Sequence, residues 1–227
     1  MQLLDPEKYP DLQLPDQWIE DAYQQHEADW ILEQIGSHQN ILELGYGSGI
    51  IVHALAAAGK NVTLVEGATR FCEQAREIQG VQVVHSLFED FSSLDTYDFV
   101  IASHVLEHVH EPCKLLMAMR RLARKMIAVV GNANSYHRQL AVLMGLQKTI
   151  YDLSERDHLV GHYRVYDEQS LTTEIQRAGW RPKIWKGFML KPLHNAALAK
   201  LPSEYIDALL RIHIVHTRAA NIGLIAA

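Results

Sequence analysis

Apolar positions along the chain follow two alternating periods. Short continuous apolar runs, which are typical of strands buried on both faces, occupy residues 40–44, 61–66, 81–85, 97–102 and 125–130. Stretches with apolar residues every three or four positions, as on one face of a helix, lie between them at residues 50–58, 68–79 and 113–123. This alternation predicts a doubly wound α/β fold, with a parallel sheet covered by helices.

The segments outside this alternation complete a single predicted domain, residues 1–227. The N-terminal segment, residues 1–36, is predicted to hold a helix that Asp16 caps and Gly36 ends. Residues 132–166 are rich in His, Arg, Asn and Tyr, and an insertion of this length after the fifth strand predicts a helical lid over a substrate. Further elements are expected after the lid: a helix at 167–178 and, within the C-terminal residues 180–227, strands at 180–190 and 221–226 and a helix at 202–217.

Composition narrows the class of protein. With 48% hydrophobic and 21% charged residues, the chain has the composition of a soluble globular protein. The formal charge of −6 argues against a nucleic-acid partner. Two distant cysteines indicate no disulfide framework, and neither a signal peptide nor a membrane-spanning run is evident. We therefore expect a cytoplasmic enzyme without membrane insertion.

The stretch "ILELGYGSGI" places three glycines directly after the first strand. Glycine permits positive φ angles and lets a ligand approach the main chain, and ligands of such sheets bind beyond the carboxyl ends of the strands. The spacing of Gly45, Gly47 and Gly49 differs from the GxGxxG of dinucleotide sites, and the acid Glu43 would face a pyrophosphate. S-adenosylmethionine has an ammonium, a sulfonium and no phosphate, so it fits Glu43 better.

Glu66 ends the second strand, within "VTLVE". At this place a carboxylate accepts hydrogen bonds from both hydroxyls of an adenosine ribose. The alternative is an ordinary solvated acid at a strand end. Because the glycine turn alone is weak, it is the combination with Glu66 that predicts a nucleoside site.

The motifs "ILELGYGSG", "LVE" and "YDFVIASHVLEHVHEP" resemble those of the class I S-adenosylmethionine-dependent methyltransferases, particularly the small-molecule enzymes related to the ubiquinone-biosynthesis O-methyltransferases. The resemblance is clearest over residues 40–130. It implies a Rossmann-like sheet of seven strands whose last strand, expected at 221–226, is antiparallel. It also implies S-adenosylmethionine as cofactor, S-adenosylhomocysteine as product, and a set of cofactor-binding residues: Glu43, Gly45, Gly47, Gly49, Glu66, Phe88, Glu89 and Ser103.

The adenine contact departs from the family pattern. Many relatives have an Asp soon after the third strand that meets the adenine amino group, whereas Leu87 stands at the matching position here. We expect Phe88 to cover the adenine ring and Glu89 to take the part of the acid. Packing of Leu87 and Phe88 in the core is the alternative.

The segment "SHVLEHVH" brings His104, Glu107 and His108 directly after the fourth strand, where the methyl group should face its acceptor. One interpretation makes a histidine the general base. Another makes the three residues ligands of a divalent metal, as in some relatives. A third interpretation gives Glu107 and His108 a structural role, in which their side chains connect loops by hydrogen bonds. We expect His104 to be the base, with His162 as second candidate, and the structural role for Glu107 and His108, so that a metal is possible but not expected.

The lid offers polar side chains for an acceptor. The candidates are Asn134, His137, Arg138, His158 and Arg164, and arginine suits a carboxylate or phosphate. Asn134 instead suits a turn, and Arg164 a surface ion pair. The expected reaction is methyl transfer to a hydroxyl of a small metabolite or sugar-like precursor, with a small amine as the rival acceptor. A NAD-dependent oxidoreductase and a non-catalytic cofactor-binding protein are the alternatives from other classes.

Overall fold

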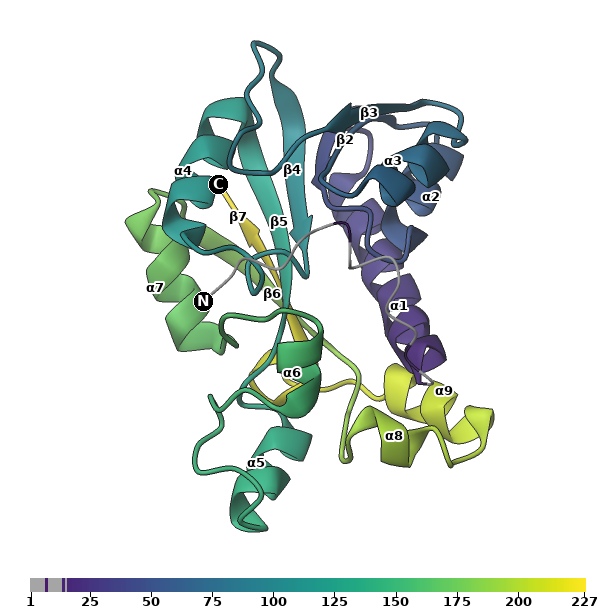
Figure 1. Ribbon diagram of the computed structural model, residues 1–227, viewed down its shortest axis with the longest axis vertical. Helices are drawn as coiled ribbons and strands as arrows, with labels where there is room; N and C mark the ends of the chain where they lie inside the picture. The colour runs from purple at the N-terminus through teal and green to yellow at the C-terminus, as the bar shows by residue number, and fades with distance from the viewer. Residues whose placement is uncertain (1–6, 8–13, 15) are drawn as a thin grey trace.

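The computed structural model describes residues 7, 14 and 16–227. Its centre is a seven-stranded sheet of order β3-β2-β1-β4-β5-β7-β6 (Figure 1). The strands are β1 (Asn40–Leu44), β2 (Asn61–Glu66), β3 (Val81–His85), β4 (Tyr97–Ser103), β5 (Ala123–Gly131), β6 (Pro182–Phe188) and β7 (Asn221–Ala226). β7 runs antiparallel to both of its neighbours, while the pairs among β1 to β5 are parallel. The predicted fold class, including the antiparallel last strand, is confirmed.

Helices cover both faces of this sheet and form a separate group beyond its lower end (Figure 1). They are α1 (Gln17–Ile35), α2 (Ile50–Ala57), α3 (Thr69–Arg76), α4 (Pro112–Leu122), α5 (Tyr136–Leu143), α6 (Glu155–Leu159), α7 (Glu168–Arg177), α8 (Asn195–Leu198) and α9 (Ser203–Arg211). Buried side chains of α1, α2 and α3 pack on one face of the sheet, and those of α4 and α7 on the other. The helices α5 and α6 lie in the insertion after β5, as predicted.

The period of two along the central strands explains their continuous apolar runs. In β1, Ile41 packs toward α1 and α2, whereas Leu42 and Leu44 pack toward α4 and α7. Because successive side chains point to opposite faces, and both faces are covered, each position except the polar ends is apolar. Glu43, on the same face as Ile41, is the exception inside β1.

Most predicted elements are observed with boundaries shifted by a few residues at most, and two expectations fail for a physical reason. The helix predicted at 202–217 is too long, because α9 ends at Arg211 and only a short 3-10 turn at His216–Arg218 follows. The β-branched residues Ile212, Ile214 and Val215 after Arg211 are poor helix formers. Asp16 precedes α1 as expected, yet its side chain makes no capping hydrogen bond and pairs with Arg156 at 2.7 Å.

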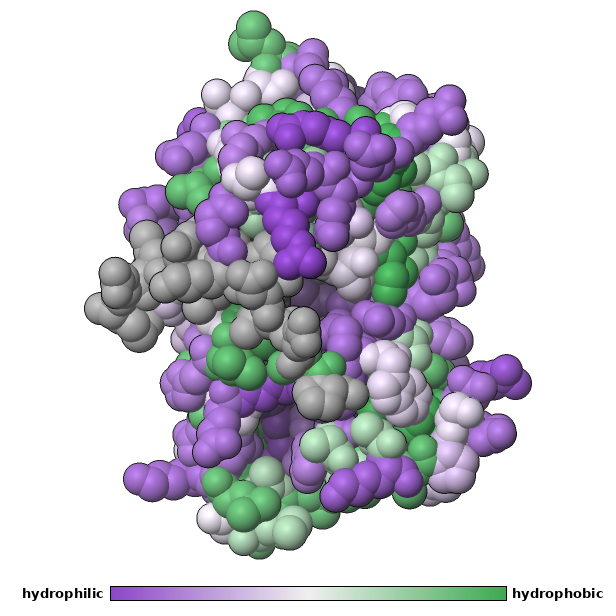
Figure 2. Space-filling model, turned by 45° about the vertical axis from the view of Figure 1, so that its right-hand side comes forward, coloured by the Kyte–Doolittle hydropathy of each residue, from purple (hydrophilic) through white to green (hydrophobic). Residues whose placement is uncertain are grey.

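The carboxyl ends of the parallel strands point toward the lid helices. The β4 arrow in Figure 1 ends on the side where α5, α6, α8 and α9 lie. Figure 2 shows hydrophilic surface, coloured purple, in the recess between the sheet and this group of helices. Among the described residues, no helix has the length and apolar character needed to cross a bilayer.

Candidate active site

The glycine turn after β1 has the backbone that its composition predicts. Gly45, Gly47 and Gly49 have φ angles of 83°, 54° and 80°, in the left-handed region that favours glycine. Space is also restricted, because a Cβ on Gly49 would lie 2.6 Å from the hydroxyl of Tyr46. A Cβ on Gly45 would lie 3.5 Å from Cζ of Phe88. The turn is therefore a closely packed surface of bare main chain.

Glu66 fixes this turn to the end of β2. Its two carboxylate oxygens accept hydrogen bonds from the backbone N–H groups of Tyr46 at 2.8 Å and of Ala68 at 2.7 Å. The side chain is buried, so the interpretation as a solvated acid is wrong. Each oxygen keeps a second lone pair for another donor. Ribose binding by Glu66 stays a prediction that this geometry permits.

Two buried polar atoms face the helix α1 without a partner. Oε2 of Glu43 and Oγ of Ser103 accept or donate no hydrogen bond within the described part of the chain. Glu43 is paired in register with Ile101, so Ser103, two residues further along β4, lies on the same face of the sheet. Burial raises the pKa of Glu43 well above its usual range. A ligand with an ammonium group would supply the missing donor, and S-adenosylmethionine has one.

His104 is held from two sides by carboxylates. Its Nε2 lies 3.1 Å from Oε2 of Glu27 on α1, and its Nδ1 lies 3.8 Å from Oε1 of Glu107. Glu27 is fully buried, and its Oε1 accepts a hydrogen bond of 2.7 Å from the side chain of Asn221. Burial alone would lower the pKa of His104, but the charge of Glu27 and the hydrogen bond with Glu107 raise it well above its usual value. The two carboxylates therefore favour the protonated form of the ring.

Glu107 contacts His104 and the end of β5, whereas His108 faces His162. Glu107 accepts a hydrogen bond of 2.8 Å from the N–H of Gly131 and so ties the loop after β4 to the end of β5, as predicted. Burial would raise the pKa of Glu107, but the contact with His104 lowers it to about 2. His108 faces the ring of His162, with centroids 4.7 Å apart, and burial lowers its pKa to about 4. Among residues 7, 14 and 16–227, no three His, Cys, Asp or Glu side chains converge as a set of metal ligands.

The two arginines of the lid are engaged with the protein itself. Arg138 donates to the carbonyl oxygens of Ile150 and Asp152 and to Oδ2 of Asp157, the last at 2.6 Å. Arg164 donates to three carbonyl oxygens of the loop after β4, those of Leu106, Val109 and His110. Both guanidinium groups fasten the lid, and three bonds to the protein hold each of them in place.

The histidines proposed as acceptor contacts have different surroundings. Nδ1 of His162 lies 2.9 Å from Oδ1 of Asp157, which also holds Arg138. His137 is bonded to Ser135 at 3.0 Å, and burial, followed by the charge of Lys191, lowers its pKa well below the usual value. His158 is exposed on α6.

Of the remaining predicted site residues, Asn134 lies at the start of the lid, and Phe88 and Glu89 follow β3. The side chain of Asn134 accepts a hydrogen bond of 2.9 Å from Arg218. Phe88 packs against the glycine turn, and Glu89 is exposed. Leu87 is 46% exposed, so its interpretation as a core residue is wrong.

A family model described as a methyltransferase domain matches residues 19–182. The chain belongs to this methyltransferase family. A ubiquinone biosynthesis O-methyltransferase of Rickettsia canadensis is 31% identical over 118 residues, which are 47% of this chain and 50% of that protein. The enzyme of the same name from Bordetella avium is 26% identical over 182 residues, 73% of this chain and 72% of that one. The chain spans about half the length of the first of these relatives.

Solved methyltransferases share the fold. A possible histamine N-methyltransferase from Thermotoga maritima has a TM-score of 0.63 at 17% identity, covering 92% of this chain and 90% of that one. Magnesium protoporphyrin IX methyltransferase from Synechocystis, with bound S-adenosylhomocysteine, has a TM-score of 0.62 at 15% identity, covering 95% and 88%. At this identity the likeness shows the architecture of the methyltransferase and leaves its acceptor open.

Sequence reasoning missed three polar residues of this methyltransferase. Glu27 holds His104, Asn221 donates to Glu27, and Lys191 lies beside the lid. Glu27 carried a signal, since it stands four residues after Tyr23 on the buried face of α1, where an acid is unusual unless it has a partner. Asn221 and Lys191 carried none, because their roles depend on strands and loops far apart in the chain.

Proposed function

We propose that this domain transfers a methyl group from S-adenosylmethionine to a small-molecule acceptor, a hydroxyl of a metabolite or sugar-like precursor. The observation that carries the proposal is the buried, unpartnered carboxyl of Glu43 beside the glycine turn. An ammonium would satisfy it, whereas the pyrophosphate of a nicotinamide cofactor would meet a buried acid. Glu66 supports the proposal, because it lies at the next strand end with lone pairs left for the ribose.

The residues around the glycine turn bind and orient. Glu43 and Ser103 take the methionine end of the cofactor, and the main chain of Gly45 to Gly49 lies along it. When bound, S-adenosylmethionine supplies a methyl group activated by positively charged sulfur. Alignment of the acceptor oxygen in line with that methyl group and exclusion of water by the lid account for most of the acceleration.

His104 takes the proton that a hydroxyl acceptor loses. As an imidazolium it first has to give up its own proton, so it acts as a base only in the fraction of molecules in which it is neutral. We therefore propose that turnover with a hydroxyl acceptor rises with pH through the raised pKa of His104. The O-methyltransferase relatives favour a hydroxyl acceptor. An amine is the second candidate, because the solved neighbour from Thermotoga maritima is a possible histamine N-methyltransferase.

Calorimetric titration with S-adenosylhomocysteine and with NAD tests the proposal. We expect S-adenosylhomocysteine to bind and NAD not to bind. The substitution Glu66→Ala should weaken the binding free energy of S-adenosylhomocysteine by about 1–3 kcal/mol through lost hydrogen bonds. Glu77→Ala, an exposed acid after α3, is the matched control and should bind normally. Binding of NAD without S-adenosylhomocysteine would overturn the proposal. Transfer of label from methyl-labelled S-adenosylmethionine to a cell extract, followed by NMR of the product, distinguishes oxygen from nitrogen methylation.

A further inference from the structure

Lys191 lies between the lid and α1, at the edge of the sheet that carries the site. β5 and β6 are both antiparallel to β7, so they run in the same direction, and Lys191 comes three residues after the carboxyl end of β6. Its carbonyl oxygen accepts a hydrogen bond of 3.1 Å from the N–H of His137 in the lid. Four residues further on, Asn195 donates to Glu20 of α1 at 3.2 Å. These bonds hold the segment of Lys191 against the lid on one side and against α1 on the other.

The acids around Lys191 already have arginine partners. Arg156 pairs with Asp16 and with Glu20, and Arg138 pairs with Asp157. The ammonium of Lys191 makes no hydrogen bond or ion pair with any residue that the structure describes. Burial lowers the pKa of Lys191 to about 8. The charge of Glu20 raises this pKa, whereas the charges of Arg156 and Arg138 lower it. A partly buried cation without a counter-ion is an anion-binding group.

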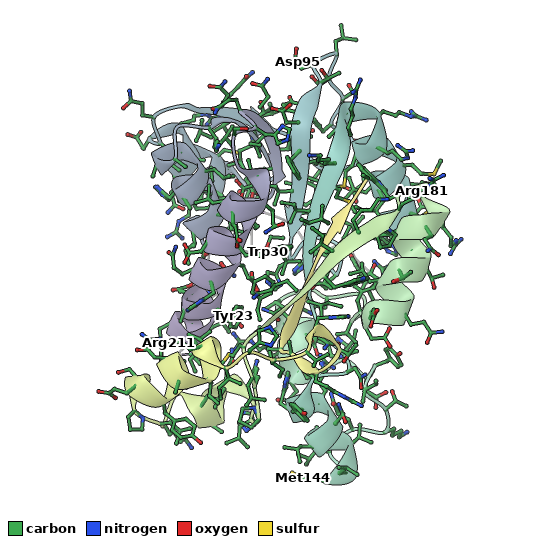
Figure 3. All side chains as sticks on the ribbon, turned by 180° about the vertical axis from the view of Figure 1, so that it is seen from behind. Tyr23, Trp30, Asp95, Met144, Arg181 and Arg211 are labelled. Carbon is green, nitrogen blue, oxygen red and sulfur yellow. The ribbon has the colours of Figure 1, made fainter. Side chains whose placement is uncertain are left out.

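Lys191 and His104 both interact with acids of α1. Glu20, whose charge acts on Lys191, and Glu27, which holds His104, are seven residues apart, and seven residues of helix span about 10 Å. Tyr23 stands between them, buried on the same side, with its ring 6.3 Å from that of His104. In Figure 3 Tyr23 lies on α1 and Met144 marks the far tip of the lid. Lys191 and His104 are thus both connected to α1, through Glu20 and Glu27 respectively.

We propose that Lys191 binds an anionic group of the acceptor, a carboxylate or a phosphate. The inference rests on the proposed methyl transfer and names its substrate class, an acidic small molecule. The lid arginines Arg138 and Arg164 suit the same chemistry, but carbonyl oxygens and Asp157 occupy them. Lys191, by contrast, is a cation beside the lid for which the described residues provide no such partner.

Binding of simple anions tests the site without an acceptor. Lysines are reductively methylated with ¹³C, S-adenosylhomocysteine is added, and inorganic phosphate or acetate is titrated by NMR. The resonance absent from Lys191→Met is expected to shift saturably and its pKa to rise, while that of exposed Lys200 stays in place. The anion with the larger effect tells phosphate from carboxylate. If Lys191 responds no more than Lys200, the proposal is overturned.

Fractionation of acceptors tests the substrate class. A small-molecule extract is separated on an anion-exchange column, and each fraction is supplied with labelled S-adenosylmethionine and the full chain. Label is expected in the retained, acidic fraction, and Lys191→Met should raise KM for it about tenfold or more while the affinity for S-adenosylhomocysteine is unchanged. Lys200→Met should behave as the wild type. Label confined to the unretained fraction, or an unchanged KM, would refute the role of Lys191. Failure of the wild type to bind S-adenosylhomocysteine would instead refute the proposed function itself.

Discussion

The carboxylate of Glu27 and the imidazole of His104 form an ion pair, with 3.1 Å between Oε2 and Nε2, across the 77 residues that separate them in the chain. The pair joins α1 to the end of β4, and Asn221 at the start of β7 completes it. His104 has a φ angle of 53°, which is unusual for a residue with a side chain and is retained here by the contacts of its ring. The first helix is therefore part of the candidate site.

Replacing Glu27 with Gln removes this charge while keeping the size of the side chain. We expect the pKa of His104 to fall and the pH at which turnover is half-maximal to fall with it, as measured by histidine NMR and by a pH–rate profile. The stability from the pair is complete below the unfolded pKa, about 6.5, and is lost as pH rises through the higher folded pKa. The variant should therefore lose most stability at acid pH. Glu33→Gln, on the exposed side of α1, should change nothing.

Glu43→Gln should stabilise the free protein and weaken cofactor binding. The buried Glu43 has a folded pKa above its unfolded one, so the folded state holds more protons and loses stability as pH rises between these two values. Gln has no such proton to lose, and thermal unfolding near pH 7 should move to higher temperature. Binding of S-adenosylhomocysteine by the wild type should release a proton from Glu43, seen by calorimetry in buffers of different ionisation enthalpy. Proton release that persists in the variant would refute the assignment of Glu43.

Gly49→Ala and Gly59→Ala separate backbone strain from collision in the site. Both glycines have positive φ, 80° and 71°, where an alanine costs about 1–2 kcal/mol. No atom lies within 4 Å of a Cβ on Gly59, whereas one on Gly49 would displace Tyr46. Gly59→Ala should lower the free energy of unfolding by that amount and bind S-adenosylhomocysteine normally. Gly49→Ala should be less stable and should lose binding; equal behaviour of the two variants would contradict this account.

Asp157 organises the lid, because Arg138, His162 and Ser154 all bond to it. Burial would raise the pKa of Asp157, but the bond with His162 and the charge of Arg138 lower it, so its stabilising effect is present above about pH 4 and is lost as pH falls. Asp157→Asn should destabilise the lid by about 3 kcal/mol. Limited proteolysis should then cut the lid faster, whereas Glu155→Gln, exposed on α6, should leave the rate unchanged.

The sheet was predictable because each central strand is covered on both faces. A strand that is buried on both faces has a continuous run of apolar residues, which the sequence shows directly. Four strands, at 40–44, 61–66, 81–85 and 221–226, match their predicted residues. The glycine turn and Glu66 were predictable for a local reason, since they follow strands whose ends are visible in the sequence. What Arg138 and Arg164 contact was not predictable, because the carbonyl oxygens that they bind come from loops whose paths no local pattern sets.

The two backbone bonds that Glu66 accepts fix the glycine turn before any ligand arrives. A nucleoside that enters such a preorganised turn does not have to order the loop, so little conformational entropy is lost on association. Binding at this end of the site should then be fast and nearly rigid. Any slow, adaptive step of binding is then expected in the lid, and stopped-flow measurements with and without an acceptor would detect it.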